Sequence, residues 1–154
     1  MPIVKKTLIY GYGNPGRQDD GLGARFTELT EKWITENNLN DITVDCNYQL
    51  NIEDAATISE YERVIFVDAS VVEDVKSFRL EPIEPNDATI EFTMHAVSTA
   101  FVVHLCQTIY KKAPEAYNLH IRAYEFDFKE ELTQQAAENM LDALAFLKEF
   151  LTKG

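Results

Sequence analysis

The chain has 154 residues, 45% of them hydrophobic and 26% charged, which is the composition of one globular domain over residues 1–154 and excludes a disordered chain. Its net charge of −12 disfavours nucleic acid as a partner, because phosphates carry the same sign of charge. No apolar run approaches the roughly 18–20 residues that span a bilayer, and the N-terminus lacks a signal-peptide pattern. We therefore expect a cytoplasmic monomer without a membrane partner.

The first half of the sequence alternates between strand and helix patterns. Residues 7–11 predict a strand, and a Gly-rich turn over 11–16 leads to a helix expected over 20–37, where apolar residues recur at helical spacing. Residues 42–46 predict a second strand, and a short helix is expected over 52–59.

Three further strands are expected in the second half. Residues 63–68 form a near-continuous apolar run, which is typical of a central parallel strand buried on both faces. Residues 77–82 predict a weaker strand at a sheet edge, because prolines follow it. Residues 118–124 predict another strand.

Two helices complete the pattern. One begins near Ser98, a suitable N-cap, and its apolar face carries Phe101, Leu105 and Ile109. The other starts near Thr133, and its core stripe consists of Met140, Leu144, Leu147 and Leu151. Alternating strands and helices predict an α/β fold, a mostly parallel sheet with helices on both faces.

The two cysteines have no metal-site spacing. Cys46 and Cys106 lie sixty residues apart, without a histidine at motif distance from either. One falls in a predicted strand and the other in a predicted helix. We therefore expect both to be buried and reduced.

Two carboxylates and an imidazole fall at predicted strand ends or before helices. Asp20 follows the first strand, Asp68 ends the most buried strand, and His95 lies three residues before Ser98. Because ligands of such folds bind beyond the carboxyl ends of the strands, we expect these side chains around one cleft, where they suit a divalent metal or acid–base chemistry. Each also has a structural explanation: a helix-dipole partner, a loop cap and a hydrogen-bonded surface histidine, respectively.

Three glycines spell G-x-G-x-x-G after the first strand, and they are Gly11, Gly13 and Gly16. This is the dinucleotide-binding signature, so a nucleotide-binding domain is the alternative hypothesis. Three features oppose it. Asp19 and Asp20 lie where a pyrophosphate needs a bare helix N-terminus, and Pro15 lacks an amide that could cradle a phosphate. The chain is also too short to carry a substrate domain beside a full dinucleotide-binding fold.

The segment from Gly11 to Gly23, with the pattern G-x-G-N-x₄-D-D-G-x-G, resembles the opening motif of the nickel–iron hydrogenase maturation endopeptidases. Residues 64–69 are similar to that family's second acidic strand end, and residues 93–95 to its histidine segment before a helix. Residues 49–55 also resemble the loop after its second strand. The match extends from residue 7 to the last helix.

The resemblance implies a three-layer α/β/α sandwich around a twisted, mostly parallel sheet of about five strands. It also implies an endopeptidase that removes the C-terminal extension of the hydrogenase large-subunit precursor after nickel insertion. Asp20, Asp68 and His95 match the family's metal-contacting and catalytic positions. Some members have Glu at the first position, where the shorter Asp keeps the charge. Met94 replaces the usual small polar residue next to the histidine.

Two roles for the metal follow from the resemblance. In one, nickel already bound in the substrate is recognised by the three side chains, and the free enzyme binds nickel weakly or not at all. In the other, a bound metal polarises the carbonyl or activates water, with Asp19 or Asp20 as a general base. We expect Gly11, Gly13, Asn14 and Asp19 to shape the cleft, and no covalent catalysis, because no Cys–His or Ser–His motif is present. A chaperone that holds the large subunit without cutting it would use the same triad.

Overall fold

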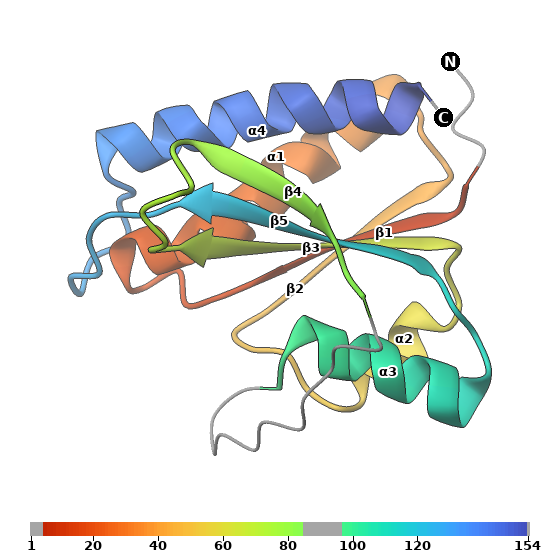
Figure 1. Cartoon of the computed structure of the whole chain (residues 1–154). Helices are drawn as coiled ribbons and strands as arrows, with labels where there is room; N and C mark the ends of the chain where they lie inside the picture. Colours follow the sequence, from red (N-terminus) through yellow and green to blue (C-terminus); the bar gives the residue numbers. More distant parts are fainter. Residues whose placement is uncertain (1–4, 85–96, 154) are drawn as a thin grey trace.

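A computed structural model describes residues 5–84 and 97–153. Its elements in chain order are β1 (Thr7–Tyr12), the 3-10 helix η1 (Gln18–Gly21), α1 (Leu22–Asn37), β2 (Ile42–Asn47), α2 (Asp54–Ile58), β3 (Arg63–Ser70), β4 (Phe78–Pro82), α3 (Thr99–Tyr110), β5 (Glu115–Arg122) and α4 (Gln134–Thr152). Helices α1 and α4 cover one face of the sheet, and α2 and α3 cover the other (Figure 1). The predicted three-layer α/β fold is confirmed.

The sheet has five strands in the order β2-β1-β3-β5-β4. Strands β2, β1, β3 and β5 are parallel, whereas β4 pairs antiparallel with β5 at one edge. The predicted central position of β3 and the predicted edge position of β4 are both confirmed. Because the parallel strands share a direction, the carboxyl ends of β1, β2 and β3 meet at one edge of the sheet, which is where the candidate site lies (Figure 1).

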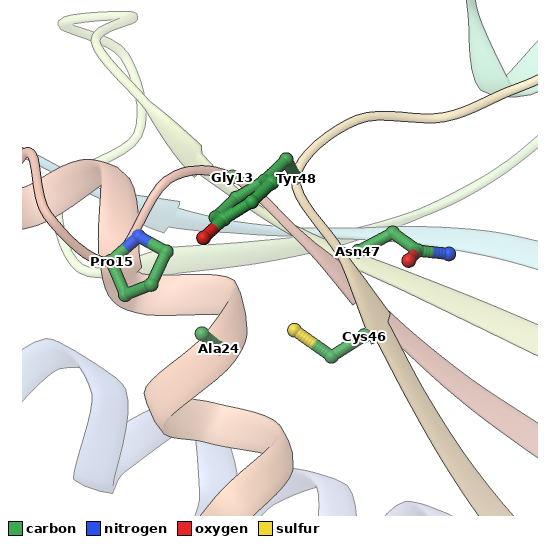
Figure 2. Close-up of a pocket in the computed structure, with 6 residues that line it drawn as sticks. All are labelled: Gly13, Pro15, Ala24, Cys46, Asn47 and Tyr48. Carbon is green, nitrogen blue, oxygen red and sulfur yellow. The ribbon is translucent and has the colours of Figure 1, made fainter.

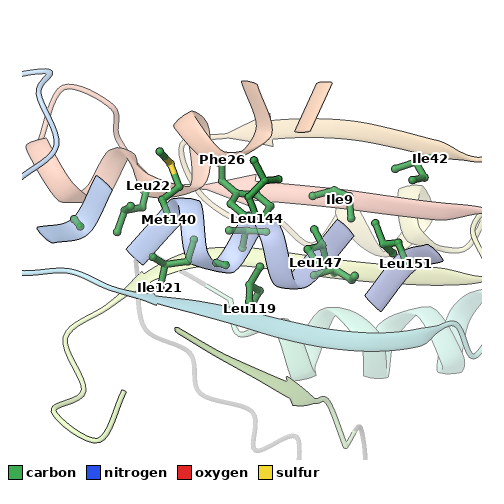
Figure 3. Packing of buried hydrophobic residues seen from close by; sticks show 14 of the residues in the cluster. Ile9, Leu22, Phe26, Ile42, Leu119, Ile121, Met140, Leu144, Leu147 and Leu151 are labelled. Atoms are coloured by element: carbon green, nitrogen blue, oxygen red, sulfur yellow. The ribbon is translucent and has the colours of Figure 1, made fainter. Parts of the chain in front are cut away.

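Two apolar cores flank the sheet, because alternate side chains of a strand point to opposite faces. The core beneath α1 and α4 includes Ile9, Leu22, Phe26, Leu119, Ile121, Met140, Leu144, Leu147 and Leu151 (Figure 3). The core beneath α2 and α3 includes Leu8, Tyr10, Val64, Phe66, Val102, Val103 and Cys106. The stripe predicted for α4 therefore lies in the first core, as expected. Among residues 5–84 and 97–153, none of the helices combines the length and the hydropathy of a membrane span.

Side chains define the starts of the two later helices. The Ser98 hydroxyl accepts a hydrogen bond from the Phe101 amide at the start of α3 (3.1 Å), which confirms the predicted N-cap. The Thr133 hydroxyl accepts one from the Ala136 amide at the start of α4 (3.3 Å). Helix α1 begins two residues later than predicted, at Leu22, because η1 occupies the preceding turn.

Two expectations about burial are wrong. Helix α3 buries Val102, Val103 and Cys106, whereas Ile109 is 59% exposed. Apolar side chains lie on two neighbouring stripes of this helix. The stripe that packs against α2 and the sheet is the one with Val102, Val103 and Cys106. Cys106 is buried as predicted, but Cys46 is exposed, because it lies at the end of the edge strand β2, where no further strand covers it among the described residues.

Candidate functional site

The turn after β1 holds Asp20 in place. Gly13 has a left-handed backbone (φ +135°), and a Cβ there would lie 2.1 Å from the Asp20 carbonyl oxygen, so this position requires glycine. The Asn14 amide donates a hydrogen bond to Asp20 Oδ2 (2.8 Å). Beneath the turn, Gly11 and Gly23 allow α1 to pack closely on β1, because a Cβ on Gly11 would lie 2.4 Å from the Gly23 carbonyl oxygen. Close packing and the turn together fix the position of the Asp20 carboxylate.

The amides of this turn are already hydrogen-bonded within the protein. The Gly13 amide donates to the Asn47 carbonyl (3.1 Å), and the Gly16 amide donates to Asn14 Oδ1 (2.8 Å). The Arg17 amide donates to the Asn14 carbonyl (3.0 Å), and Pro15 has no amide hydrogen. With the Asn14 amide bound to Asp20, the turn has no free amide between residues 13 and 17 to bind a phosphate.

Asp68 is held by a tyrosine and a histidine at the carboxyl end of β3. The Tyr12 hydroxyl donates to Asp68 Oδ2 (3.2 Å), and His120 Nδ1 lies 2.9 Å from Asp68 Oδ1. The register of β3 and β5 places Asp68 directly beside His120. On its other side, His120 Nε2 lies 3.7 Å from the Glu81 carboxylate of β4.

The Asp68 carboxylate contributes to the pKa shifts of both of its partners, His120 and Tyr12. The hydrogen bond with Asp68 raises the pKa of His120 above its ordinary value, although burial opposes the shift. Burial and the neighbouring Asp68 charge raise the pKa of Tyr12, so its hydroxyl remains a hydrogen-bond donor. The Tyr12 hydroxyl and the His120 imidazole therefore hold the Asp68 side chain in one orientation.

Asp20 and Asp68 line the same pocket, which has a volume of about 280 Å³. The other residues around it are Tyr12, Gly13, Tyr48, Gln49, Leu50, Ala69 and Val97. The structure thus brings together two of the three predicted site residues, Asp20 from η1 and Asp68 from the end of β3, at the expected edge of the sheet. Two carboxylates that open onto one pocket can bind a cation or activate water.

His95 lies outside the described residues, so its position in the site stays a prediction. The described chain resumes at Val97, and Val97 lines the pocket. Among residues 5–84 and 97–153, no three histidine, cysteine, aspartate or glutamate side chains form a group that could hold a metal ion. The two described carboxylates alone are an incomplete metal site.

Asp19, which we expected to shape the cleft or act as a base, is fully buried. Its Oδ1 accepts a hydrogen bond from the Thr133 amide (2.8 Å), and its Oδ2 accepts from the Thr133 hydroxyl (2.8 Å). The same Oδ2 accepts from the amides of Tyr124 (2.9 Å) and Glu125 (3.1 Å). This carboxylate joins the turn after β1 to the loop between β5 and α4, and no solvent-exposed surface remains for contact with a substrate or an attacking water.

Sequence reasoning missed His120 and Tyr12. A signal was present, because His120 lies between Asn118 and Arg122 in alternate positions of a predicted strand, and three polar side chains then share one face. Only the register of β3 and β5 shows that this face brings His120 next to Asp68.

Comparisons with known proteins give a likeness of fold. No protein-family model matches the chain, and no curated protein matches it in sequence. A NiFe hydrogenase maturation protease, HycI from Thermococcus kodakarensis, superposes with a TM-score of 0.75 at 18% identity, over 97% of this chain and 94% of that chain. The hydrogenase maturating endopeptidase HybD from E. coli gives 0.77 at 16% identity, over 96% and 93%.

A solution structure of the endopeptidase HycI from Escherichia coli gives a TM-score of 0.67 at 19% identity, over 94% of this chain and 90% of that chain. The chain therefore has the fold of the NiFe hydrogenase maturation proteases over nearly its full length, which is the family its sequence resembles.

Proposed function

We propose that this chain is a cytoplasmic endopeptidase that removes the C-terminal extension of a nickel-loaded hydrogenase large-subunit precursor. The observation that carries the proposal is the shared pocket of Asp20 and Asp68 at the carboxyl edge of the sheet. The likeness in fold to HycI and HybD supports it, because those proteins are hydrogenase maturation proteases and endopeptidases.

We assign His95 as the third metal-contacting residue. The resemblance matches it to the family's histidine position, and Val97, the first described residue after it, lines the pocket. An imidazole with two carboxylates is a donor set that divalent nickel accepts.

Nickel in this proposal is part of the substrate. The enzyme offers two hard carboxylates and one imidazole, whereas the precursor's thiolates complete the coordination in the complex. We therefore expect the free enzyme to bind nickel ions weakly and to bind the nickel-loaded precursor strongly. Tyr12 and His120 keep the Asp68 carboxylate oriented toward the pocket for this contact.

Hydrolysis also needs a base that takes a proton from the attacking water. Of the two adjacent carboxylates in the turn, Asp20 faces the pocket, whereas Asp19 is enclosed by its own hydrogen bonds. Asp20 is therefore the described side chain suited to this step. The protein needs no nucleophile of its own, because water attacks the peptide carbonyl directly.

The experiment compares nickel-loaded and nickel-free precursor mixed with the purified protein, and mass spectrometry detects the released C-terminal peptide. We expect release only from loaded precursor, and none with Asp20→Ala, Asp68→Ala or His95→Ala. Asp142→Ala, an exposed position on α4, is the matched control that should cut normally. Stable binding of loaded precursor without release would instead support a chaperone.

The nucleotide-binding alternative is disfavoured by the internal bonding of the turn's amides. It predicts that a dinucleotide raises the melting temperature, while loaded precursor neither binds nor is cut. That pair of results would refute the endopeptidase.

A further inference from the structure

A second, smaller pocket adjoins the site. It has a volume of about 180 Å³ and is lined by Gly13, Pro15, Ala24, Cys46, Asn47 and Tyr48. Gly13 and Tyr48 also line the pocket of Asp20 and Asp68, so the two pockets meet at these residues. We call the smaller one the side pocket.

The side pocket is uncharged. Figure 2 shows the Tyr48 ring extending toward Pro15, and the Cys46 sulfur pointing toward Ala24 of α1. The Asn47 side chain points away from the pocket and donates a hydrogen bond to the Tyr10 hydroxyl (2.9 Å). Desolvation of the partly enclosed sulfur raises the pKa of the Cys46 thiol, so the thiol stays neutral at pH 7 although the residue as a whole is exposed. The walls therefore consist of a proline ring, a methyl group, a neutral thiol and an aromatic ring.

Tyr48 stands between the two pockets and is 74% exposed. A solvent-exposed aromatic ring beside an uncharged pocket is a common anchor for a bound peptide, because a peptide that covers the ring removes a large apolar surface from water.

The side pocket lies beside a strand edge that an extended peptide can use. Cys46 and Asn47 are the last two residues of β2, which is the outermost strand at that edge of the described sheet. The Cys46 amide already donates to Asp45 Oδ1 (2.8 Å), so an extended peptide would pair with other backbone groups of this edge strand, and neighbouring pockets would receive its side chains.

We propose that the side pocket is a substrate subsite that receives one aliphatic side chain of the precursor, from a residue flanking the bond that is cut. The inference rests on the proposed function and adds to it a preference for an uncharged side chain of limited size. The side pocket meets the pocket of Asp20 and Asp68 at Gly13 and Tyr48, so a side chain bound in the side pocket would lie next to the bond that is cut.

The test uses precursor variants. Once mass spectrometry has located the cut, the residue on each side of it is replaced in turn by Ala, Leu, Asp or Lys, and kcat/KM is measured. At one of the two positions we expect Leu to exceed Asp and Lys by about tenfold or more, because a charge would lose its hydration in an uncharged pocket. Equal rates for all four residues at both positions would overturn the inference.

Two enzyme variants narrow the side pocket from opposite walls. Ala24→Leu adds a larger side chain to the wall formed by α1, and Cys46→Leu adds one to the wall formed by β2. Each should lower the ratio of kcat/KM for the Leu precursor to that for the Ala precursor by about tenfold, since a filled pocket excludes the larger side chain. Ala145→Leu makes the same exchange at an exposed position of α4 and should leave the ratio unchanged.

Alkylation of the wild-type protein gives a readout that needs no variant to fold. Cys106 is fully buried and Cys46 is exposed, so iodoacetamide should react at Cys46. With loaded Leu precursor maintained at about four times its KM, only about a fifth of the enzyme is free during turnover, and alkylation should slow about fivefold.

The outcomes separate the two proposals. If precursor is cut while the Leu-to-Ala ratio in both narrowed variants and the alkylation rate stay unchanged, the subsite is refuted and the endopeptidase stands. If loaded precursor is neither bound nor cut, the endopeptidase fails and the subsite fails with it.

Discussion

Asp19 and Asp20 are neighbouring carboxylates whose replacement should lower the free energy of unfolding by very different amounts. Asp19→Ala removes the acceptor of four hydrogen bonds, three from backbone amides and one from the Thr133 hydroxyl. Three of these four donors lie at Tyr124 and Thr133, where β5 ends and α4 begins, and water does not reach the carboxylate they share. Asp20→Ala removes one hydrogen bond, from the Asn14 amide, at a half-buried position.

The magnitude follows from the number and burial of these bonds. A hydrogen bond to a charged group contributes about 1.5–3 kcal/mol, but four that share one carboxylate are not additive. We expect Asp19→Ala to lower the free energy of unfolding by about 4 kcal/mol, within the roughly 3–5 kcal/mol typical of broken buried networks. At about 2–4 °C per kcal/mol for a chain of this size, the melting temperature falls by about 8–16 °C. For Asp20→Ala we expect a loss of about 1 kcal/mol or less.

Urea unfolding followed by far-ultraviolet circular dichroism measures both values, and an unchanged m-value shows that the same surface is exposed in each variant. Asp19→Asn is the intermediate control. It retains one acceptor oxygen but turns an amide group toward donors, so its loss should be smaller than that of Asp19→Ala. Equal losses for Asp19→Ala and Asp20→Ala, or a loss under about 1 kcal/mol for Asp19→Ala, would refute the structural role of Asp19.

The remaining predictions concern the metal, the site and acid stability. Titration calorimetry should detect weak or no nickel binding by the free protein, and tight binding with chelator-sensitive cleavage of nickel-free precursor would contradict recognition through the substrate. His120→Ala should raise KM for loaded precursor about tenfold by releasing Asp68, with kcat and melting temperature nearly unchanged and partial rescue by His120→Asn; a loss in melting temperature without a KM effect would contradict it. The pKa of Glu115 lies below its ordinary 4.5. Partial burial would raise this pKa, but the hydrogen bond from Lys5 (2.7 Å) and the charge of Arg63 lower it by more. The ionised Glu115 therefore stabilises the fold above pH 4.5, and this stabilisation is lost as pH falls through the folded-state pKa, so Glu115→Gln should be less stable than the wild type at pH 7 and match it in strong acid.

Local patterns were sufficient for most of the fold. The apolar run of β3 predicted a central strand, and the stripe from Met140 to Leu151 predicted the buried face of α4, because burial on both faces or on one stripe leaves a direct mark in the sequence. The stripe of α3 was misassigned, since Phe101, Leu105 and Val102 are all apolar and only the position of α2 selects among them.

The candidate site was predictable where a side chain follows a strand, and not where it depends on register. Asp20 and Asp68 could be placed at one edge of the sheet because parallel strands end together. The contact of His120 with Asp68 required the pairing of β3 with β5, two strands that are more than forty residues apart in sequence. The buried role of Asp19 likewise required the loop before α4, which no pattern in the turn itself indicates.

The glycine-rich turn shows why a short motif does not settle a function. A turn after a parallel strand binds phosphate when its amides point outward and unpaired toward the ligand. In this protein the Asp20 carboxylate takes one of those amides, and an asparagine side chain, two carbonyls and a proline leave none of the others free. The turn therefore presents a carboxylate to the pocket where a phosphate-binding turn would present hydrogen-bond donors. Since a carboxylate attracts cations and repels phosphate, the internal bonding of the turn favours the proposed cation contact over a phosphate site at this edge.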